Sequence, residues 1–307
     1  MTQIPWAWGF FFWLVDLKIL RPLVRWIRRF LNHLNTKNLQ DFLEKENFDW
    51  IFSTHFFPNE VLSHLKRKGN IRAKIVSVIT DFDVHSIWIT DGIDYYTAAC
   101  EFTKEKLLAL GVPAENIFVY GIPTDQKFSQ KLDQATLRKK LGFNEDLFTV
   151  LVATGSFGIG PIEKIIEALS AQGFQVVVVC GHNKKMFERL NEKPIDRVKV
   201  CGLVHNMHEL MALSDCMITK PGGLSISEAL VRHLPLIFFN AIPGQETQNI
   251  AVLKTYGIGI SGCSIQEMVE ELRKLRSSPE VLHNAQRNIQ KLARPDSVAQ
   301  IISLIHE

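Results

Sequence analysis

The stretch that decides the fold is CMITKPGGLSISEAL, which runs from Cys216 to Leu230. Its first four residues predict a short buried strand, and the pattern from Ser225 onward predicts a helix. Between them lies a Pro-Gly-Gly turn whose glycines, Gly222 and Gly223, let a ligand come close to the backbone. The free N–H groups at the start of the following helix attract anions. A strand, a glycine turn and a helix start in this order are typical of a phosphate site at the carboxyl end of a parallel sheet.

The same residues also have a purely structural interpretation. Ser225 and Glu228 fit a capping box, in which the Ser side chain accepts from the N3 amide and the Glu side chain bonds back to the backbone of the cap. Capping boxes are common at helix starts, so the spacing alone leaves capping and ligand binding both open.

Short apolar runs alternate with helical patterns along the rest of the chain. The runs that we expect to form strands are Asp49–Thr54, Ala73–Thr80, Asp94–Ala99, Asn116–Gly121, Phe148–Thr154, Gln175–Cys180, Arg197–Val204, Cys216–Thr219, Pro235–Asn240 and Ile258–Ser261. Most of them precede a helical pattern, such as Pro161–Gln172, in which proline occupies the first helical position. This alternation predicts an α/β protein with parallel sheets.

A domain boundary is expected between the two sets of strands. Ile122 and Pro123 end the first set, and a charged stretch over residues 126–144 precedes the strand that begins at Phe148. We therefore expect one doubly wound domain over residues 1–125 and another over residues 147–294. A chain of 307 residues is long enough for both.

The composition excludes several classes of protein. A hydrophobic share of 46% with 22% charged residues is ordinary for a folded protein, and a net charge of +3 gives no reason to expect a nucleic-acid partner. The five cysteines are scattered and lack CxxC spacing, so we expect neither a disulfide framework nor a zinc site, and a reducing compartment.

The basic charge is concentrated near the start of the chain, beside aromatic residues. The apolar segment Ile4–Val15 is only twelve residues long, whereas a membrane-spanning helix needs roughly 20. Aromatic rings beside arginines are typical of a helix that lies in a membrane interface and is attracted to anionic lipid. An ordinary core helix with a solvated basic face is the alternative. The candidate membrane residues are Trp6, Trp8, Phe11, Trp13, Arg25, Arg28 and Arg29.

Three separated motifs carry a resemblance to a known family. They are the Pro221-Gly222-Gly223 turn with its helix, the run Pro243-Gly244-Gln245-Glu246, and the pattern Thr80-Asp81-Phe82-x-x-His85-x-x-Trp88. In this combination the chain resembles the monogalactosyldiacylglycerol synthases and the processive diacylglycerol glucosyltransferases. These enzymes are relatives of the peptidoglycan enzyme that adds N-acetylglucosamine to lipid I.

The resemblance implies the two-domain GT-B fold, with the first domain incomplete and a final helix over residues 295–307 that returns to it. It also implies an inverting enzyme that moves glucose or galactose from a UDP-sugar to diacylglycerol, as a peripheral protein on the cytoplasmic face of the cell membrane. No metal and no cofactor other than the UDP-sugar donor are expected. Two alternatives stay open: transfer of N-acetylglucosamine to a polyprenyl-linked acceptor, and a nucleotide-sugar-binding protein with impaired catalysis.

By the same resemblance, most of the candidate residues bind the donor. Glu228 would accept the ribose hydroxyls, and the backbone near Val204 would contact uracil. The hexose would contact Gln245 and Glu246, and more weakly Asn249. The residues expected near the phosphates are Gly222, Gly223, Ser225 and, in the loop after the strand Phe148–Thr154, Gly155, Ser156 and Gly158. That loop lacks the dinucleotide spacing GxGxxG, and a plain turn between strand and helix is its alternative interpretation.

The candidate catalytic residues are Asp81 and His85. Asp81 would orient His85 or receive the proton of the acceptor hydroxyl, and His85 would contact the lipid headgroup or the acceptor. His85 could instead be a packed residue beside Trp88. Asp81-Phe82-Asp83 is formally a DxD metal triplet, but that triplet is typical of a different glycosyltransferase fold, so we expect no metal here.

The sequence departs from the family in one respect. The family opens its first domain with a strand and a glycine-rich loop that ends in His, upstream of the region matching Trp6, and assigns its presumed catalytic base to that loop. No residue of this sequence inherits the role. We therefore expect either a truncated reading of a longer gene or a chain that lacks this first unit.

Overall fold

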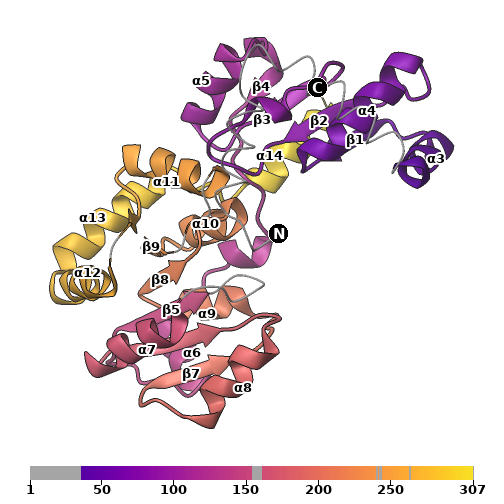
Figure 1. Cartoon of the computed structure of the whole chain (residues 1–307). Helices are drawn as coiled ribbons and strands as arrows, with labels where there is room; N and C mark the ends of the chain where they lie inside the picture. The colour runs from indigo at the N-terminus through magenta and orange to yellow at the C-terminus, as the bar shows by residue number, and fades with distance from the viewer. Residues whose placement is uncertain (1–35, 154–160, 240, 242–243, 263, 307) are drawn as a thin grey trace. The chain divides into compact units, whose positions relative to one another are not determined.

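The computed structural model describes residues 36–306, apart from 154–160, 240, 242–243 and 263. Its contacts divide the chain into two compact units (Figure 1). The first comprises the described residues of Met1–Pro123, Ile242–Gln248 and Asp296–Glu307, and the second those of Thr124–Ala241 and Asn249–Pro295. Each unit is built on a parallel sheet of its own.

The sheet of the first unit has the order β1-β2-β3-β4, with all neighbours parallel. Its strands are β1 (Trp50–Ser53), β2 (Lys74–Val78), β3 (Tyr95–Thr97) and β4 (Ile117–Phe118). Its helices are α3 (Lys37–Glu46), α4 (Phe56–Lys68), α5 (Glu101–Ala109), α14 (Ser297–Ser303) and the short 3₁₀ turns η1 (Ser86–Trp88), η2 (Ala114–Asn116) and η4 (Leu304–His306). A helix or turn follows each strand at its carboxyl end, as parallel connections require.

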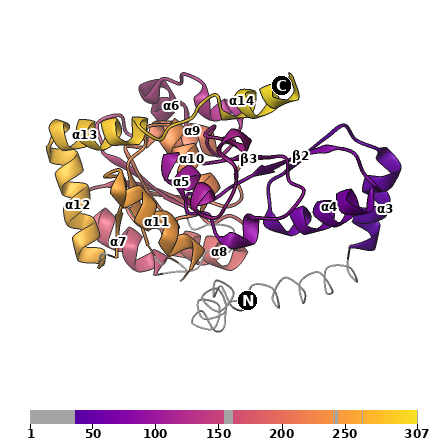
Figure 2. The same cartoon turned by 90° about the horizontal axis from the view of Figure 1, so that it is seen from above.

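Adjacent residues of β2 face opposite sides of this sheet, because side chains alternate along a strand. Ile75 packs against Leu62 and Leu65 of α4, and α3 lies beside α4 in Figure 2 and adds Leu43 to the same cluster. On the other side, the buried cluster joins four side chains from opposite ends of the chain, Val76 and Val78 of β2 with Ile301 and Leu304. The final helical segment is therefore part of the core of the first unit.

The sheet of the second unit has the order β10-β9-β8-β5-β6-β7, again with all neighbours parallel. Its strands are β5 (Thr149–Ala153), β6 (Gln175–Val179), β7 (Val198–Cys201), β8 (Cys216–Thr219), β9 (Leu236–Phe238) and β10 (Ile260–Ser261). The chain runs outward from β5 to β7 and then returns to place β8 against the other side of β5, where Val150 pairs with Cys216. The junction of β5 and β8 is thus the topological switch point, where doubly wound sheets bind ligands beyond the carboxyl ends of their strands.

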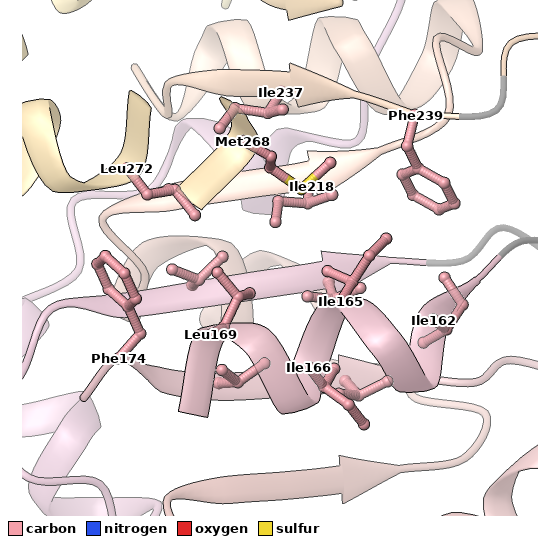
Figure 3. Packing of buried hydrophobic residues seen from close by; sticks show 14 of the residues in the cluster. Ile162, Ile165, Ile166, Leu169, Phe174, Ile218, Ile237, Phe239, Met268 and Leu272 are labelled. Atoms are coloured by element: carbon pink, nitrogen blue, oxygen red, sulfur yellow. The ribbon is translucent and has the colours of Figure 1, made fainter. Parts of the chain in front are cut away.

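The core of the second unit lies between this sheet and helices packed on it. The helical elements of the unit are η3 (Gln126–Ser129), α6 (Gln134–Lys140), α7 (Ile162–Ala171), α8 (Lys184–Glu192), α9 (Met207–Leu213), α10 (Gly223–Val231), most of α11 (Gln245–Thr255), α12 (Ile265–Ser277) and α13 (Pro279–Gln290). Ile162, Ile165, Ile166 and Leu169 recur at helical spacing along α7, and Figure 3 shows them gathered with residues of β8, β9 and α12. This apolar face fixes α7 against the strands.

The ten strands and the two parallel sheets predicted from the sequence are confirmed, and each strand except that at Cys216–Thr219 is shorter than expected. The capping box at Ser225, one of the two interpretations that the sequence left open, is not formed. Helix α10 already begins at Gly223, with Gly222 as an extended N-cap residue, so Ser225 lies inside the first turn. Likewise, α7 begins at Ile162, and Pro161 is its N-cap residue rather than its first helical one. Glycine and proline can both adopt the backbone conformation of an N-cap residue. Each helix therefore begins at a different residue from the one that the sequence predicted.

Candidate donor and acceptor sites

The turn between β8 and α10 lies directly beyond the switch point of the second sheet. Within it, the Gly222 amide donates to the Lys220 carbonyl over 2.9 Å, and the Gly222 carbonyl accepts the first helical bond, from Ile226, over 3.0 Å. Asn249, whose side chain is buried, donates through Nδ2 to the Pro221 carbonyl over 3.1 Å. The structure thus places Asn249 as a support of the turn.

Gly222 has no conformational need to be glycine. Its φ of −76° suits any residue, and a Cβ added there would meet nothing within 4 Å. The first N–H groups of a helix have no partner within that helix, so the start of α10 offers donors to an anion. Open space beside such donors is what a phosphate needs for a close approach to the backbone.

Glu228 is half-buried on α10. Burial raises the pKa of its carboxyl from 4.5 to about 7; the positive charge of Lys127 opposes this rise and the negative charge of Asp125 adds to it. A half-buried carboxyl whose pKa is raised toward neutrality can bind hydroxyl groups of a ligand. Lys127 and Asp125 pair with each other over 3.1 Å at the start of η3.

The segment η3 is held against α10 by Arg232. Its Nη1 donates to two carbonyls of this segment, that of Phe128 over 3.2 Å and that of Gln130 over 2.6 Å, and Phe128 is buried. Sequence reasoning missed the two charged residues beside Glu228, because Lys127 and Asp125 are about a hundred residues away in the chain and reach it only through this packing. The one residue whose position in the sequence could have indicated this packing is Arg232, at the end of α10.

The other donor candidates are distributed as follows. Val204 is half-buried in the loop that follows β7, because that strand ends at Cys201 rather than at Val204 as expected. Glu246 is half-buried in the first turn of α11. Gly155, Ser156 and Gly158 lie outside the described residues, as do the membrane candidates Trp6, Trp8, Phe11, Trp13, Arg25, Arg28 and Arg29.

A second group of polar residues lies at the carboxyl edge of the first sheet. Asp81 follows β2 and is only 4% exposed. Its Oδ1 accepts a 2.5 Å hydrogen bond from Nε2 of Gln245, the first residue of α11, although 164 residues separate the two in the chain. Gly244, with a φ of 104°, makes the turn that leads into this helix. Asp81 and Gln245, which the sequence analysis treated separately, are thus in contact.

His85 is the N-cap residue of η1. Its Nδ1 accepts from the Ile87 amide over 3.1 Å, and Trp88 of the same turn is buried. An Nδ1 that accepts this bond leaves Nε2 as the protonated nitrogen of the neutral ring. The structure therefore gives His85 a local capping role and combines it with the packing that the sequence analysis left as an alternative.

His55 is a further residue of this edge that sequence reasoning missed. It follows β1, is exposed, and caps α4 by accepting from the Phe57 amide over 3.1 Å. The loops after β1 and β2 meet where Thr80 Oγ1 donates to the Thr54 carbonyl over 3.4 Å. A histidine at a strand end before a helix was the available signal.

The carboxylates of the DxD triplet bind different partners. Asp83 pairs with Lys106 over 2.5 Å, whereas Asp81 accepts from Gln245. Among the residues that the structure describes, no group of three or more His, Cys, Asp or Glu side chains is placed to hold a metal ion. Over the same residues, no helix has the length and apolar character needed to cross a membrane.

Comparison with known proteins identifies the family. The model for monogalactosyldiacylglycerol (MGDG) synthase matches residues 12–124, and that for glycosyl transferases group 1 matches residues 133–292. The processive diacylglycerol beta-glucosyltransferase of Bacillus mycoides is 32% identical over 274 residues, which make up 88% of this chain and 70% of that relative.

Solved structures show the same fold at low identity. The structure of Anabaena HepE in complex with UDP and glucose has a TM-score of 0.57 and 16% identity, with 88% of this chain and 80% of that one covered. The UDP-GlcNAc 2-epimerase of Neisseria meningitidis bound to UDP-GlcNAc has a TM-score of 0.64 and 15% identity, with 88% and 79% covered. Two parallel α/β units with a glycine turn at the switch point of the second sheet define a protein of the GT-B fold class, which both of these structures share. Within that class, the chain belongs to the family of MGDG synthases and processive diacylglycerol glucosyltransferases.

Proposed function

We propose that this protein transfers a hexose from a UDP-sugar to diacylglycerol. The family models that match its two halves and the names of its relatives support this assignment. The observation that carries it is the turn after β8, where open space beside Gly222 meets the start of α10 and the half-buried carboxyl of Glu228 lies farther along the same helix.

In this proposal the parts of the donor are bound by different chemistry. The amides at the start of α10 hold the diphosphate, assisted by Gly223 and Ser225, and the Glu228 carboxylate accepts the ribose hydroxyls. The amide and carboxylate of Gln245 and Glu246 supply paired donors and acceptors for the hexose. Val204 lies in the loop that would contact uracil.

The reaction is an inverting displacement. The acceptor hydroxyl of diacylglycerol attacks the anomeric carbon, the new glycosidic bond forms, and the bond from that carbon to the diphosphate oxygen breaks. The hydroxyl proton passes to a base, and UDP leaves with the bonding electron pair. Helix N–H groups that lie against the diphosphate stabilise the charge that develops on it, which supports departure without a metal ion.

The acceptor lipid places the reaction at a membrane surface. We propose that residues 1–30, with Trp6, Trp8, Phe11 and Trp13 beside Arg25, Arg28 and Arg29, attach the protein peripherally to anionic lipid on the cytoplasmic face. Aromatic rings suit the headgroup region, and each arginine near an anionic surface contributes about 1 kcal/mol.

The test is transfer by the full chain from radiolabelled UDP-glucose and UDP-galactose to diacylglycerol in vesicles that contain phosphatidylglycerol. A labelled glycosyldiacylglycerol is expected with one of the donors. Gly222→Ala is the matched variant: its methyl group fits the backbone but occupies the space beside the helix start. We expect it to fold as the wild type does, and to bind UDP at least about fivefold more weakly in calorimetry.

Two results would contradict the proposal. The first is labelled product with a polyprenyl phosphate acceptor and none with diacylglycerol. The second is UDP affinity that Gly222→Ala leaves unchanged, since the turn after β8 would then not hold the diphosphate.

A further inference from the structure

The hydrogen bond between Asp81 and Gln245 joins a candidate catalytic residue to a candidate hexose-binding residue. Asp81 is buried at 4% exposure, whereas Gln245 is exposed at the start of α11. The bond is short, 2.5 Å, and runs from Nε2 of the amide to Oδ1 of the carboxylate. The buried carboxylate has little freedom to move, so this hydrogen bond mainly restricts the exposed amide.

The chemistry of the pair settles which way the amide faces. An ionised carboxylate only accepts hydrogen bonds, whereas an amide has one end that donates and one that accepts. The Asp81 carboxylate therefore selects the orientation in which Nε2 of Gln245 points toward it. Oε1 of Gln245 is then directed away from Asp81, and it presents an acceptor in a single orientation.

The backbone around Gln245 supports the same orientation. Thr247 Oγ1 accepts from the Gly244 amide over 3.2 Å and donates to the Gly244 carbonyl over 2.8 Å, so the turn before α11 is closed by its own side chain. Asp81 lies three residues after the end of β2 and is buried. The hydrogen bond to Asp81 then restricts the side chain of Gln245, including rotation of the amide about its last bond.

We propose that Asp81 is a positioning residue, which orients the Gln245 amide so that Oε1 accepts a hydrogen bond from a hexose hydroxyl of the donor. The proposal rests on the proposed function, because it takes a UDP-hexose as the ligand. It gives Asp81 a role in sugar recognition, whereas the sequence analysis expected it to orient His85 or to receive the proton of the acceptor hydroxyl. A residue that acts through Gln245 changes the affinity for the hexose part of the donor and leaves the affinity for UDP alone.

The experiment compares calorimetric affinities of the full chain for UDP-glucose, UDP-galactose and UDP. Asp81→Asn keeps the size of the side chain but can pair with Gln245 in either amide orientation. We expect this variant to bind the preferred UDP-hexose about three- to tenfold more weakly and to bind UDP as the wild type does. Asp83→Asn is the matched control, because Asp83 is a buried carboxylate of the same loop that pairs with Lys106 instead. In Asp83→Asn, the ratio of the affinity for UDP-hexose to the affinity for UDP should equal that of the wild type.

A double-mutant cycle separates positioning from other roles of Asp81. If Asp81 acts through Gln245, Asp81→Asn has no further effect on UDP-hexose affinity once Gln245 is Ala. Gln245→Ala also serves where Asp81→Asn fails to fold, since Gln245 is exposed. Wild-type UDP-hexose affinity in Gln245→Ala, or equal losses from Asp81→Asn with and without Gln245, would overturn the proposal. A wild-type protein that binds neither UDP-hexose would instead contradict the proposed function.

Discussion

Glu228 combines burial with charge in a way that makes the stability of the protein depend on pH. Burial raises the pKa of its carboxyl from 4.5 to about 7 in the folded state. Between these pH values the folded chain keeps a proton that the unfolded chain has released, so the free energy of unfolding falls as the pH rises from about 4.5 to about 7. Above pH 7 the full cost of the buried charge is present.

Glu228→Gln removes this cost, because a neutral amide of similar shape replaces the carboxylate. We expect the variant to be more stable than the wild type at pH 8 by about 1–2 kcal/mol, a figure reduced from the full shift because Glu228 is only half-buried. The difference should vanish near pH 4.5. Urea unfolding at pH 4.5 and pH 8 measures both values.

Glu209→Gln is the control for this prediction. Hydrogen bonds from Asn206 and Lys140 hold the pKa of the Glu209 carboxyl below its usual value, so this substitution should not stabilise the protein at pH 8. A Glu228→Gln variant that is no more stable than the wild type at pH 8 would show that the carboxylate is already well solvated in the folded chain.

Single residues also show which features of the site could be predicted from the sequence and which could not. Gly222 and Glu228 lie in one turn and helix, as the sequence predicted, because residues on a short segment keep their spacing when the chain folds. The contact between Asp81 and Gln245 was not predicted, since 164 residues separate them and nothing in local spacing encodes that distance. Resemblance supplied both residues but not their relation.

At the scale of elements, α10 and α12 begin with the same kind of sequence and end up with different caps. Ser-x-x-Glu occurs at Ser225 and again at Ser264, yet only the second forms a capping box. There the Glu267 amide donates to Ser264 Oγ over 3.2 Å, and Glu267 Oε2 accepts from the Ser264 amide over 2.7 Å. Because Gly222 already caps α10, the motif at Ser225 lies within the helix.

This difference predicts opposite effects of two similar substitutions. Ser264→Ala should lower the free energy of unfolding by about 0.5–2 kcal/mol and leave UDP affinity unchanged, because it removes the cap of α12 and not part of the turn that leads into α10. Ser225→Ala should change stability by less than about 0.5 kcal/mol and weaken UDP binding. Thermal unfolding and UDP calorimetry on both variants measure the four values. A marked loss of stability with unchanged UDP affinity in Ser225→Ala would remove this residue from the proposed phosphate site.

Strand positions were predictable and helix boundaries were less so, for a physical reason. A buried parallel strand such as β6 (Gln175–Val179) must be apolar on both faces, which leaves a continuous run in the sequence. A helix start is decided by which residue takes the cap conformation, and several adjacent residues near Pro161 or Gly222 can do so.

At the scale of the whole molecule, the core of the first unit depends on a segment that follows the second unit in the chain. Leu304 is fully buried against Val76 and Val78, whereas Ile302 of α14 is 50% exposed. Leu304→Ala should therefore destabilise the first unit by about 2–5 kcal/mol, and Ile302→Ala by little.

Hydrogen exchange measures the stability of each unit separately. In Leu304→Ala, amides of β2 and β3 should exchange faster than in the wild type, while those of β5 and β6 should keep their rates, because each unit has its own sheet and buried clusters. Equal acceleration in both sheets would mean that the two units unfold as one cooperative body. The alternating pattern predicted the two sheets and the resemblance implied that a final helix returns to the first domain, but the side chains that this segment contacts followed only from the structure.

The position of Leu304 in the chain affects how the first unit folds during synthesis of the protein. Translation produces β1–β4 first, yet Ile301 and Leu304 are added only after the whole second sheet has been made. At about 5–20 residues per second, the interval between β4 and Ile301 lasts about 10–40 seconds. During that interval, while translation continues, Val76 and Val78 lack two of their apolar neighbours, Ile301 and Leu304. Of the two units, the one whose strands are translated first is thus the one whose core is completed last.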